Sequence, residues 1–169
     1  MIKKTLLALG FILMAALFQS TVLSRLVFLV HAVPDFTLII LVFTAYVNGL
    51  MVGQVSGFFS GLILDFLSAS PLGLNTLIRT LIGALAGFMK GTFFLDGVLL
   101  PMALCAGATI LKAVFLYLLY LLFPQTVPHY VFFSPVLWIE LGFNTMFAPI
   151  VFGLLKLCRP LSKGLTESA

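Results

Sequence analysis

Residues 49–65 read GLMVGQVSGFFSGLILD, the most informative stretch of the chain for its architecture. Glycine recurs at every fourth position, and the next position in the series is a carboxylate. Four-residue spacing places these positions along one face of a helix, drifting by about 40° per step. The series consists of Gly49, Gly53, Gly57, Gly61 and Asp65. This pattern predicts a membrane helix with a shallow groove into which a second helix packs closely.

The composition indicates an integral membrane protein. Hydrophobic residues make up 62% of the 169 residues and charged residues only 8%, whereas about 25% of residues are charged in soluble proteins. The apolar segments are long enough for helical spans and show no sustained period-2 alternation, which favours an all-α fold over an outer-membrane barrel. No polar segment is long enough for a soluble domain, so residues 1–169 are expected to form one membrane domain.

Six apolar ranges are expected to cross the membrane. They are residues 6–23, 35–47, 50–67, 72–89, 98–123 and 135–157. The stretch 36–67 is too long for one span and slightly short for two, but Asn48-Gly49 in its middle is a turn dipeptide. With two spans there, Lys90 falls on the same side as the N-terminal lysines and the basic tail, as the positive-inside rule requires. We therefore predict six spans with both termini in the cytoplasm.

Asp35 starts the second range and Lys156 belongs to the basic tail group. Four other ionisable side chains fall inside the predicted spans, toward the outer half of the membrane, where such groups are costly. Asp65 and Arg79 differ in depth by about one helical turn, which a guanidinium can bridge, and Asn75 lies closer still to the level of Asp65. Similar counting pairs Lys112 with Glu140. We expect these five residues to form an intramembrane polar network that either locks helices together or serves a ligand or partner.

A second stripe of small residues, Gly83, Gly87 and Gly91, lies in the fourth predicted span. A short turn joins this span to the preceding one, so the two are expected to be antiparallel neighbours. Either the two stripes face each other within the chain, or one stripe faces a transmembrane helix of a partner. Because two stripes exceed what one internal contact requires, we predict that one of them serves an external helix.

The sequence gives little support for an enzyme, a metal site or a nucleic-acid-binding protein. It contains no His-Glu metal motif, no Gly-x-Ser-x-Gly elbow and no phosphate loop. Cys105 and Cys158 are expected to be packing residues. The net charge of +4 is explained by the positive-inside asymmetry and by contact with anionic membrane lipids. We therefore expect no catalysis, no cofactor and no nucleic-acid partner.

The sequences GLILDFL (61–67) and SPLGLN (70–75) together resemble the central signature of the MreD family of rod shape-determining membrane proteins. Pro34-Asp35 before an apolar span, the small residues after Asn48-Gly49, and Gly83 to Gly87 also lie where that family has them. The positions that match the family signature are Pro34, Asp35, Asp65, Pro71, Gly73 and Asn75. The turn at residues 46–49 departs from the family pattern, because it lacks the basic residues that members often carry there.

The resemblance implies a non-enzymatic scaffold of the bacterial cell-elongation (rod) complex in the cytoplasmic membrane. It implies direct binding to MreC, and cooperation with the actin-like MreB and with the peptidoglycan synthases of that complex. It also implies a six-helix fold similar to the substrate-binding subunits of energy-coupling-factor vitamin transporters. Such a subunit is the alternative interpretation, since those subunits bind small molecules in the outer half of the membrane. Against it, no predicted outer loop is rich in polar ligand-binding residues.

Overall fold

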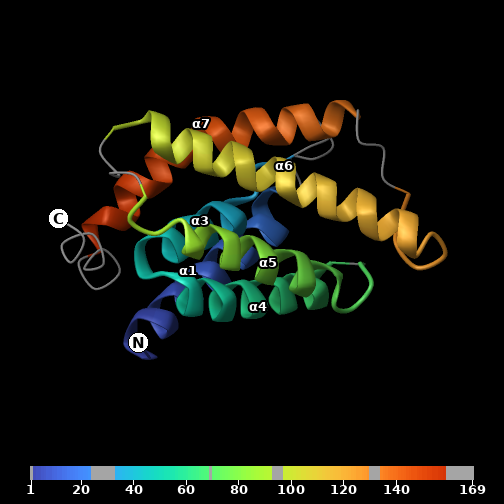
Figure 1. Ribbon diagram of the computed structural model, residues 1–169, viewed down its shortest axis with the longest axis horizontal. Helices are drawn as coiled ribbons and strands as arrows, with labels where there is room; N and C mark the ends of the chain where they lie inside the picture. The colour runs from blue at the N-terminus through green and yellow to red at the C-terminus, as the bar shows by residue number, and fades with distance from the viewer. Residues whose placement is uncertain (1, 24–32, 69, 93–96, 130–133, 159–169) are drawn as a thin grey trace.

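A computed structural model describes residues 2–23, 33–68, 70–92, 97–129 and 134–158, and over these residues the chain is helical with no strand (Figure 1). The helices are α1 (Ile2–Phe18), continued by the π-helical turn η1 (Gln19–Leu23), α3 (Phe36–Asn48), α4 (Leu50–Leu67), α5 (Leu74–Phe88), α6 (Leu99–Leu122) and α7 (Pro135–Leu157). Each α-helix falls on one of the six ranges in which the sequence predicts an apolar helix. The all-α fold class is therefore confirmed.

Three of the helices in the described ranges, α4, α6 and α7, are long and apolar enough to cross a membrane by length and composition. The other three are apolar but shorter, and α3 has only 13 residues. At 1.5 Å per residue α3 is about 20 Å long, less than the roughly 30 Å of a bilayer's hydrocarbon core. Its two ends therefore cannot both reach the membrane surfaces if it lies within a bilayer along the normal.

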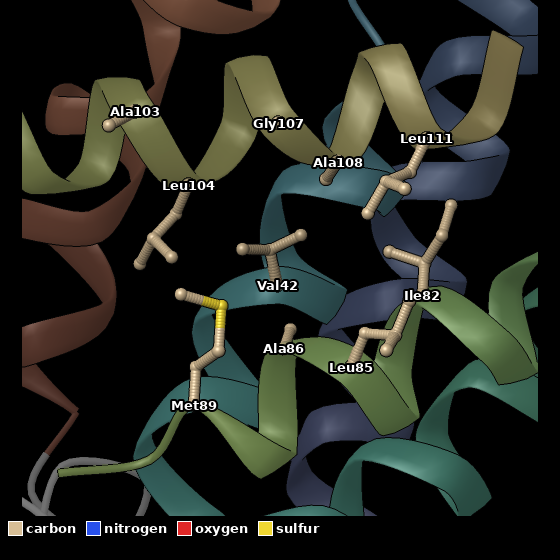
Figure 2. A pocket seen from close by; sticks show the side chains of 10 residues that line it. All are labelled: Val42, Ile82, Leu85, Ala86, Met89, Ala103, Leu104, Gly107, Ala108 and Leu111. Atoms are coloured by element: carbon tan, nitrogen blue, oxygen red, sulfur yellow. The ribbon is translucent and has the colours of Figure 1, made fainter. Parts of the chain in front are cut away.

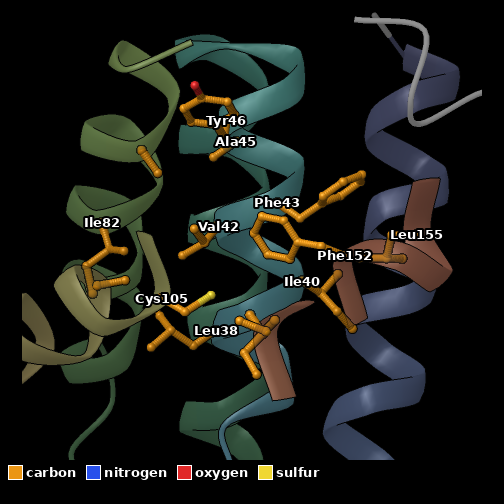
Figure 3. Packing of buried hydrophobic residues seen from close by; sticks show 14 of the residues in the cluster. Leu38, Ile40, Val42, Phe43, Ala45, Tyr46, Ile82, Cys105, Phe152 and Leu155 are labelled. Atoms are coloured by element: carbon orange, nitrogen blue, oxygen red, sulfur yellow. The ribbon is translucent and has the colours of Figure 1, made fainter. Parts of the chain in front are cut away.

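The short helix α3 is the central element of the bundle (Figure 1). Every residue from Thr37 to Val47 is buried, and α3 contacts all five other α-helices. A helix that is hydrophobic on all sides is stable when it is surrounded in this way. Figure 3 shows Ile82 of α5, Cys105 of α6 and Phe152 of α7 turned toward it. The rings of Phe43 and Phe152 meet edge to face, with centroids 5.1 Å apart.

The turn between α3 and α4 consists of a single residue, Gly49. Its backbone has φ +93°, a region that glycine adopts without the steric cost of a Cβ. Its N–H donates to the carbonyl of Ala45 at 2.8 Å and so closes the last turn of α3. The structure thus divides residues 36–67 into two helices at Asn48-Gly49, as the turn dipeptide predicts.

Successive helices run in alternating directions (Figure 1). The start of α1, the turn at Gly49, the end of α5, the start of α6 and the end of α7 lie toward one end of the bundle, on the left in the view. The end of α4, the start of α5 and the end of α6 lie toward the other end. The α6–α7 hairpin lies across the group formed by α1, α3, α4 and α5. This arrangement brings α5, α6 and α7 to the N-terminus of α3.

Candidate functional site

Asp35 begins the central helix and is itself buried, with 3% of its surface exposed. Its Oδ1 accepts hydrogen bonds from the N–H of Leu38 at 3.0 Å and from Oγ1 of Thr37 at 2.7 Å. An aspartate before the first helical residue is a favoured N-cap, and its charge interacts well with the helix N-terminus. Because α3 is short and central, this ordinary cap lies inside the bundle.

Two cations converge on the Asp35 carboxylate. Nη2 of Arg79 on α5 donates to both carboxylate oxygens, at 2.8 Å to Oδ1 and 2.6 Å to Oδ2. Nζ of Lys112 on α6 donates to Asp35 Oδ2 at 3.0 Å and to Oε1 of Glu140 on α7 at 2.5 Å. Two carboxylates and two cations from four helices therefore form one cluster. Its charges sum to zero when all four are ionised, which offsets part of the cost of burying Asp35 and Arg79. Lys112 and Glu140 are partly exposed.

A chain of neutral hydrogen bonds continues from this cluster along α6 and α7. Oδ1 of Asn144 accepts from the Asp35 N–H at 2.7 Å. Nδ2 of Asn144 donates to Oγ1 of Thr109 at 3.0 Å, and that hydroxyl donates to the Cys105 carbonyl at 2.8 Å. Asn144 and Thr109 are buried. We call the whole set the polar centre; it comprises Asp35, Arg79, Thr109, Lys112, Glu140 and Asn144.

Asp35 was expected as a family-signature position and not in the network, although it lies at the middle of the polar centre. Asn144 and Thr109 were not expected at all. Both carry a signal that identifies them, because Asn144 lies one turn after Glu140 and Thr109 one turn before Lys112. Polar side chains repeated at this spacing mark a polar helix face. One polar atom of the centre stays unsatisfied: among the described residues, the buried Nη1 of Arg79 has no hydrogen-bond partner.

Asp65 does not join Arg79, so the predicted pair is wrong. Asp65 instead accepts hydrogen bonds from the N–H groups of Gly73, Asn75 and Thr76, at 2.9, 3.0 and 3.1 Å. The side chains of Asn75 and Thr76 donate to it as well, at 3.0 and 2.6 Å. The first turn of a helix exposes unpaired N–H groups that satisfy a carboxylate without a cation. The residues of the predicted network thus form two separate clusters. Asn75 lies beside Asp65 in one, and Arg79 belongs to the other, the polar centre.

The positions that match the family signature fall into two places. Asp65, Gly73 and Asn75 form the hydrogen-bonded turn between α4 and α5, in which Pro71 also lies. Gly73 has φ +94° there, which lets its N–H reach the carboxylate. Pro34-Asp35 begins α3 at the polar centre. Both places fix where a helix begins.

The two glycine stripes face each other in the interface between α4 and α5. A Cβ on Gly57 would overlap the carbonyl group of Arg79 and lie 2.9 Å from its carbon. A Cβ on Gly87 would lie 2.8 Å from the carbonyl oxygen of Gly49. Gly53 and Gly83 meet each other's backbone in the same way, and Gly61 meets that of Asn75 and Thr76. Only glycine permits two backbones to approach this closely.

This contact overturns the prediction that one stripe serves an external helix. Both stripes lie in the interface between the antiparallel helices α4 and α5. Their glycines are spaced by four residues on both helices, so they stay opposite one another along the interface although the helices run in opposite directions. Gly91 takes no part, because it lies beyond α5 with φ +77° and no atom within 4 Å of a Cβ built on it. The glycines that do face open space are others, including Gly107 on α6 and Gly142 on α7.

Comparison with models of protein families finds a match. The sequence model of the family described as rod shape-determining protein MreD matches residues 1–158 of the chain. No curated protein and no solved structure matches it. The matched range contains all six α-helices, the polar centre and the α4–α5 turn.

Proposed function

The chain belongs to the rod shape-determining protein MreD family, and from this membership we propose that it is a non-enzymatic scaffold of the bacterial cell-elongation complex. Membership gives it a role in rod shape determination, and its long apolar helices support a membrane location. We further propose that it binds MreC directly and, with MreB, helps to organise the peptidoglycan synthases of that complex in the cytoplasmic membrane.

The polar centre is the observation that favours a scaffold over an enzyme. Its carboxylates and its lysine are each held by other side chains of the same cluster. Groups paired in this way join α3, α5, α6 and α7, and removing one partner leaves an uncompensated buried charge. A cluster committed to such pairing is suited to fixing the arrangement of helices. A rigid arrangement is what a binding scaffold presents to its partners.

The alternating helix directions support six spans with both termini in the cytoplasm. Lys90, just after α5, lies close to the Gly49 turn, since its Cδ is 3.3 Å from a Cβ built on that glycine. Lys156 lies in the last turn of α7, at the same end of the bundle. A basic end is expected to face the cytoplasm. We assign the turn between α4 and α5 to the opposite side of the membrane.

One observation favours the alternative, a small-molecule-binding subunit similar to those of energy-coupling-factor transporters. The buried Nη1 of Arg79, unpartnered among the described residues, offers a donor to an anionic group of a ligand. We rank this second because the remaining donors and acceptors that surround Asp35 are already used within the chain.

Purification from native membranes distinguishes the scaffold from the small-molecule-binding subunit. We expect an affinity-tagged chain, solubilised in mild detergent from rod-shaped cells, to recover MreC. Depletion of the chain should round those cells, and re-expression should restore rods. An unrelated polytopic protein with the same tag serves as the control for capture. Recovery of a tightly bound vitamin without MreC would reverse the ranking, and mass spectrometry of the same sample detects both.

A further inference from the structure

An apolar cavity of about 140 Å³ lies on the seam between α5 and α6, over Val42 of α3 (Figure 2). Hydrocarbon side chains and one methionine line it, and Figure 2 shows Val42, Ala86 and Met89 pointing into the space between the helices. Along α5 the lining runs from Met89 to Ile82. The seven helical rises between these two residues correspond to about 10 Å, so the cavity is a narrow apolar slot parallel to α5.

Small residues on α6 keep the slot open toward the outside of the bundle. Ala103 is exposed, and no atom lies within 4 Å of a Cβ built on Gly107. An empty slot would leave its lining without the dispersion contacts that a packed interior makes. In a membrane protein, an occupant from the lipid phase can supply those contacts.

The size of the slot selects among apolar occupants. A helix with its side chains is about 10–12 Å across and cannot enter a space of this volume. A cavity of roughly 150 Å³ holds a molecule the size of benzene. A stretch of acyl chain is narrow enough to enter the slot, and it can extend along the slot parallel to α5.

A lysine directly follows the residue at one end of the slot. Met89 ends α5 and lines the slot, and Lys90 follows it with its side chain exposed. Within the described part of the chain Lys90 forms no ion pair. A lysine at the end of an apolar helix lies where lipid head groups are found, and it attracts anionic ones. We propose that the α5–α6 slot binds one acyl chain of an anionic phospholipid whose phosphate contacts Lys90.

Lipid retention tests this proposal. The protein is reconstituted into vesicles of equal parts phosphatidylglycerol and phosphatidylcholine, extracted in mild detergent, and analysed by native mass spectrometry. We expect the wild type to retain phosphatidylglycerol in preference to phosphatidylcholine. Gly107→Leu fills the slot and should lose the retained lipid. Gly142→Leu is the matched control, because that glycine also faces open space but lies outside the slot, and it should retain the lipid as the wild type does.

The charge is tested separately. Lys90→Gln should retain lipid but lose the preference for phosphatidylglycerol, and Lys90→Arg should keep it. Should Gly107→Leu fail to fold, Ala103→Leu narrows the same slot and carries the test. Undiminished retention in the slot variant, or an equal loss in Gly142→Leu, would overturn the proposal. So would a wild type that retains no lipid or does not distinguish the two head groups.

Discussion

Gly57→Ala should destabilise the protein, although alanine is the better helix former. In an unobstructed helix this change is favourable by about 1 kcal/mol. At Gly57, however, the added Cβ would meet the backbone of α5, 2.9 Å from the carbonyl carbon of Arg79 and 3.0 Å from Cα of Thr80. Backbone atoms cannot rotate away, so the helices must separate, at about 1–3 kcal/mol for such overpacking and sometimes more. We expect a net loss of about 1–2 kcal/mol, obtained by setting the propensity gain against the upper part of that range.

Gly142→Ala is the matched control, because a Cβ there meets no atom within 4 Å. Only the conformational gain remains, so this variant should be more stable than the wild type by up to about 1 kcal/mol. Thermal unfolding in one detergent measures both, and a change of 1 kcal/mol shifts the midpoint by roughly 2–4 °C in a protein of this size. A Gly57→Ala midpoint at or above the wild-type value would refute the backbone-to-backbone contact between α4 and α5.

Single cysteines in a background without native cysteines should be modified by a membrane-impermeant reagent from outside at Leu72 and not at Thr92. Outside labelling at Thr92 would rule out six spans with both termini in the cytoplasm. Asp65→Ala should cost about 1–2 kcal/mol of stability, because Asp65 caps the first N–H groups of α5. Asp65→Asn should cost less because it keeps an acceptor. Equal costs would contradict the role given to the retained acceptor. Asn144→Ala should cost about 1–3 kcal/mol of stability because it leaves buried groups unpaired. Thr145→Ala is the control and should have little effect, because it removes a hydroxyl that donates to a carbonyl of its own helix. Similar effects of the two changes would argue against the polar centre.

The helices and the central turn are predictable from the sequence because their causes are local. Apolar runs of helical length set the six ranges, and Asn48-Gly49 supplies a turn residue that tolerates a positive φ. The length of α3 also follows from the sequence, since Asp35 caps one end and Gly49 closes the other. That α3 is the central helix depends on packing. Its uniform hydrophobicity is the only sequence signal for it.

The partner of Arg79 could not be predicted from the sequence in the same way. Counting residues from a turn gives depth in the membrane but not the rotation of a helix about its axis. By depth alone Asp65 is a reasonable partner. The structure instead satisfies Asp65 with N–H groups of the next helix, and it turns Arg79 toward α3. The sequence also gives no sign that the Asp35 cap lies inside the bundle, because that follows from the packing of α3 among five neighbours.

The glycine stripes show the same limit. Their spacing correctly predicts close packing against another helix. It does not say which helix, because a stripe has the same appearance whether its neighbour belongs to the chain or to a partner. In the structure, the short turn and the matching steps of the two stripes bring Gly53 onto Gly83. Any surface that binds a partner must therefore be formed by other residues.

A double-mutant cycle on Asp35→Asn and Arg79→Gln most directly tests the claim that Asp35 anchors a polar centre joining four helices. Each single change should destabilise the protein strongly, by about 3–5 kcal/mol for a broken buried pair. The double variant should lose less than the sum, with a coupling energy above about 0.5 kcal/mol. The same cycle on Asp65→Asn and Arg79→Gln should be additive within that limit. Additivity between Asp35 and Arg79, or stronger coupling of Arg79 to Asp65, would contradict the account.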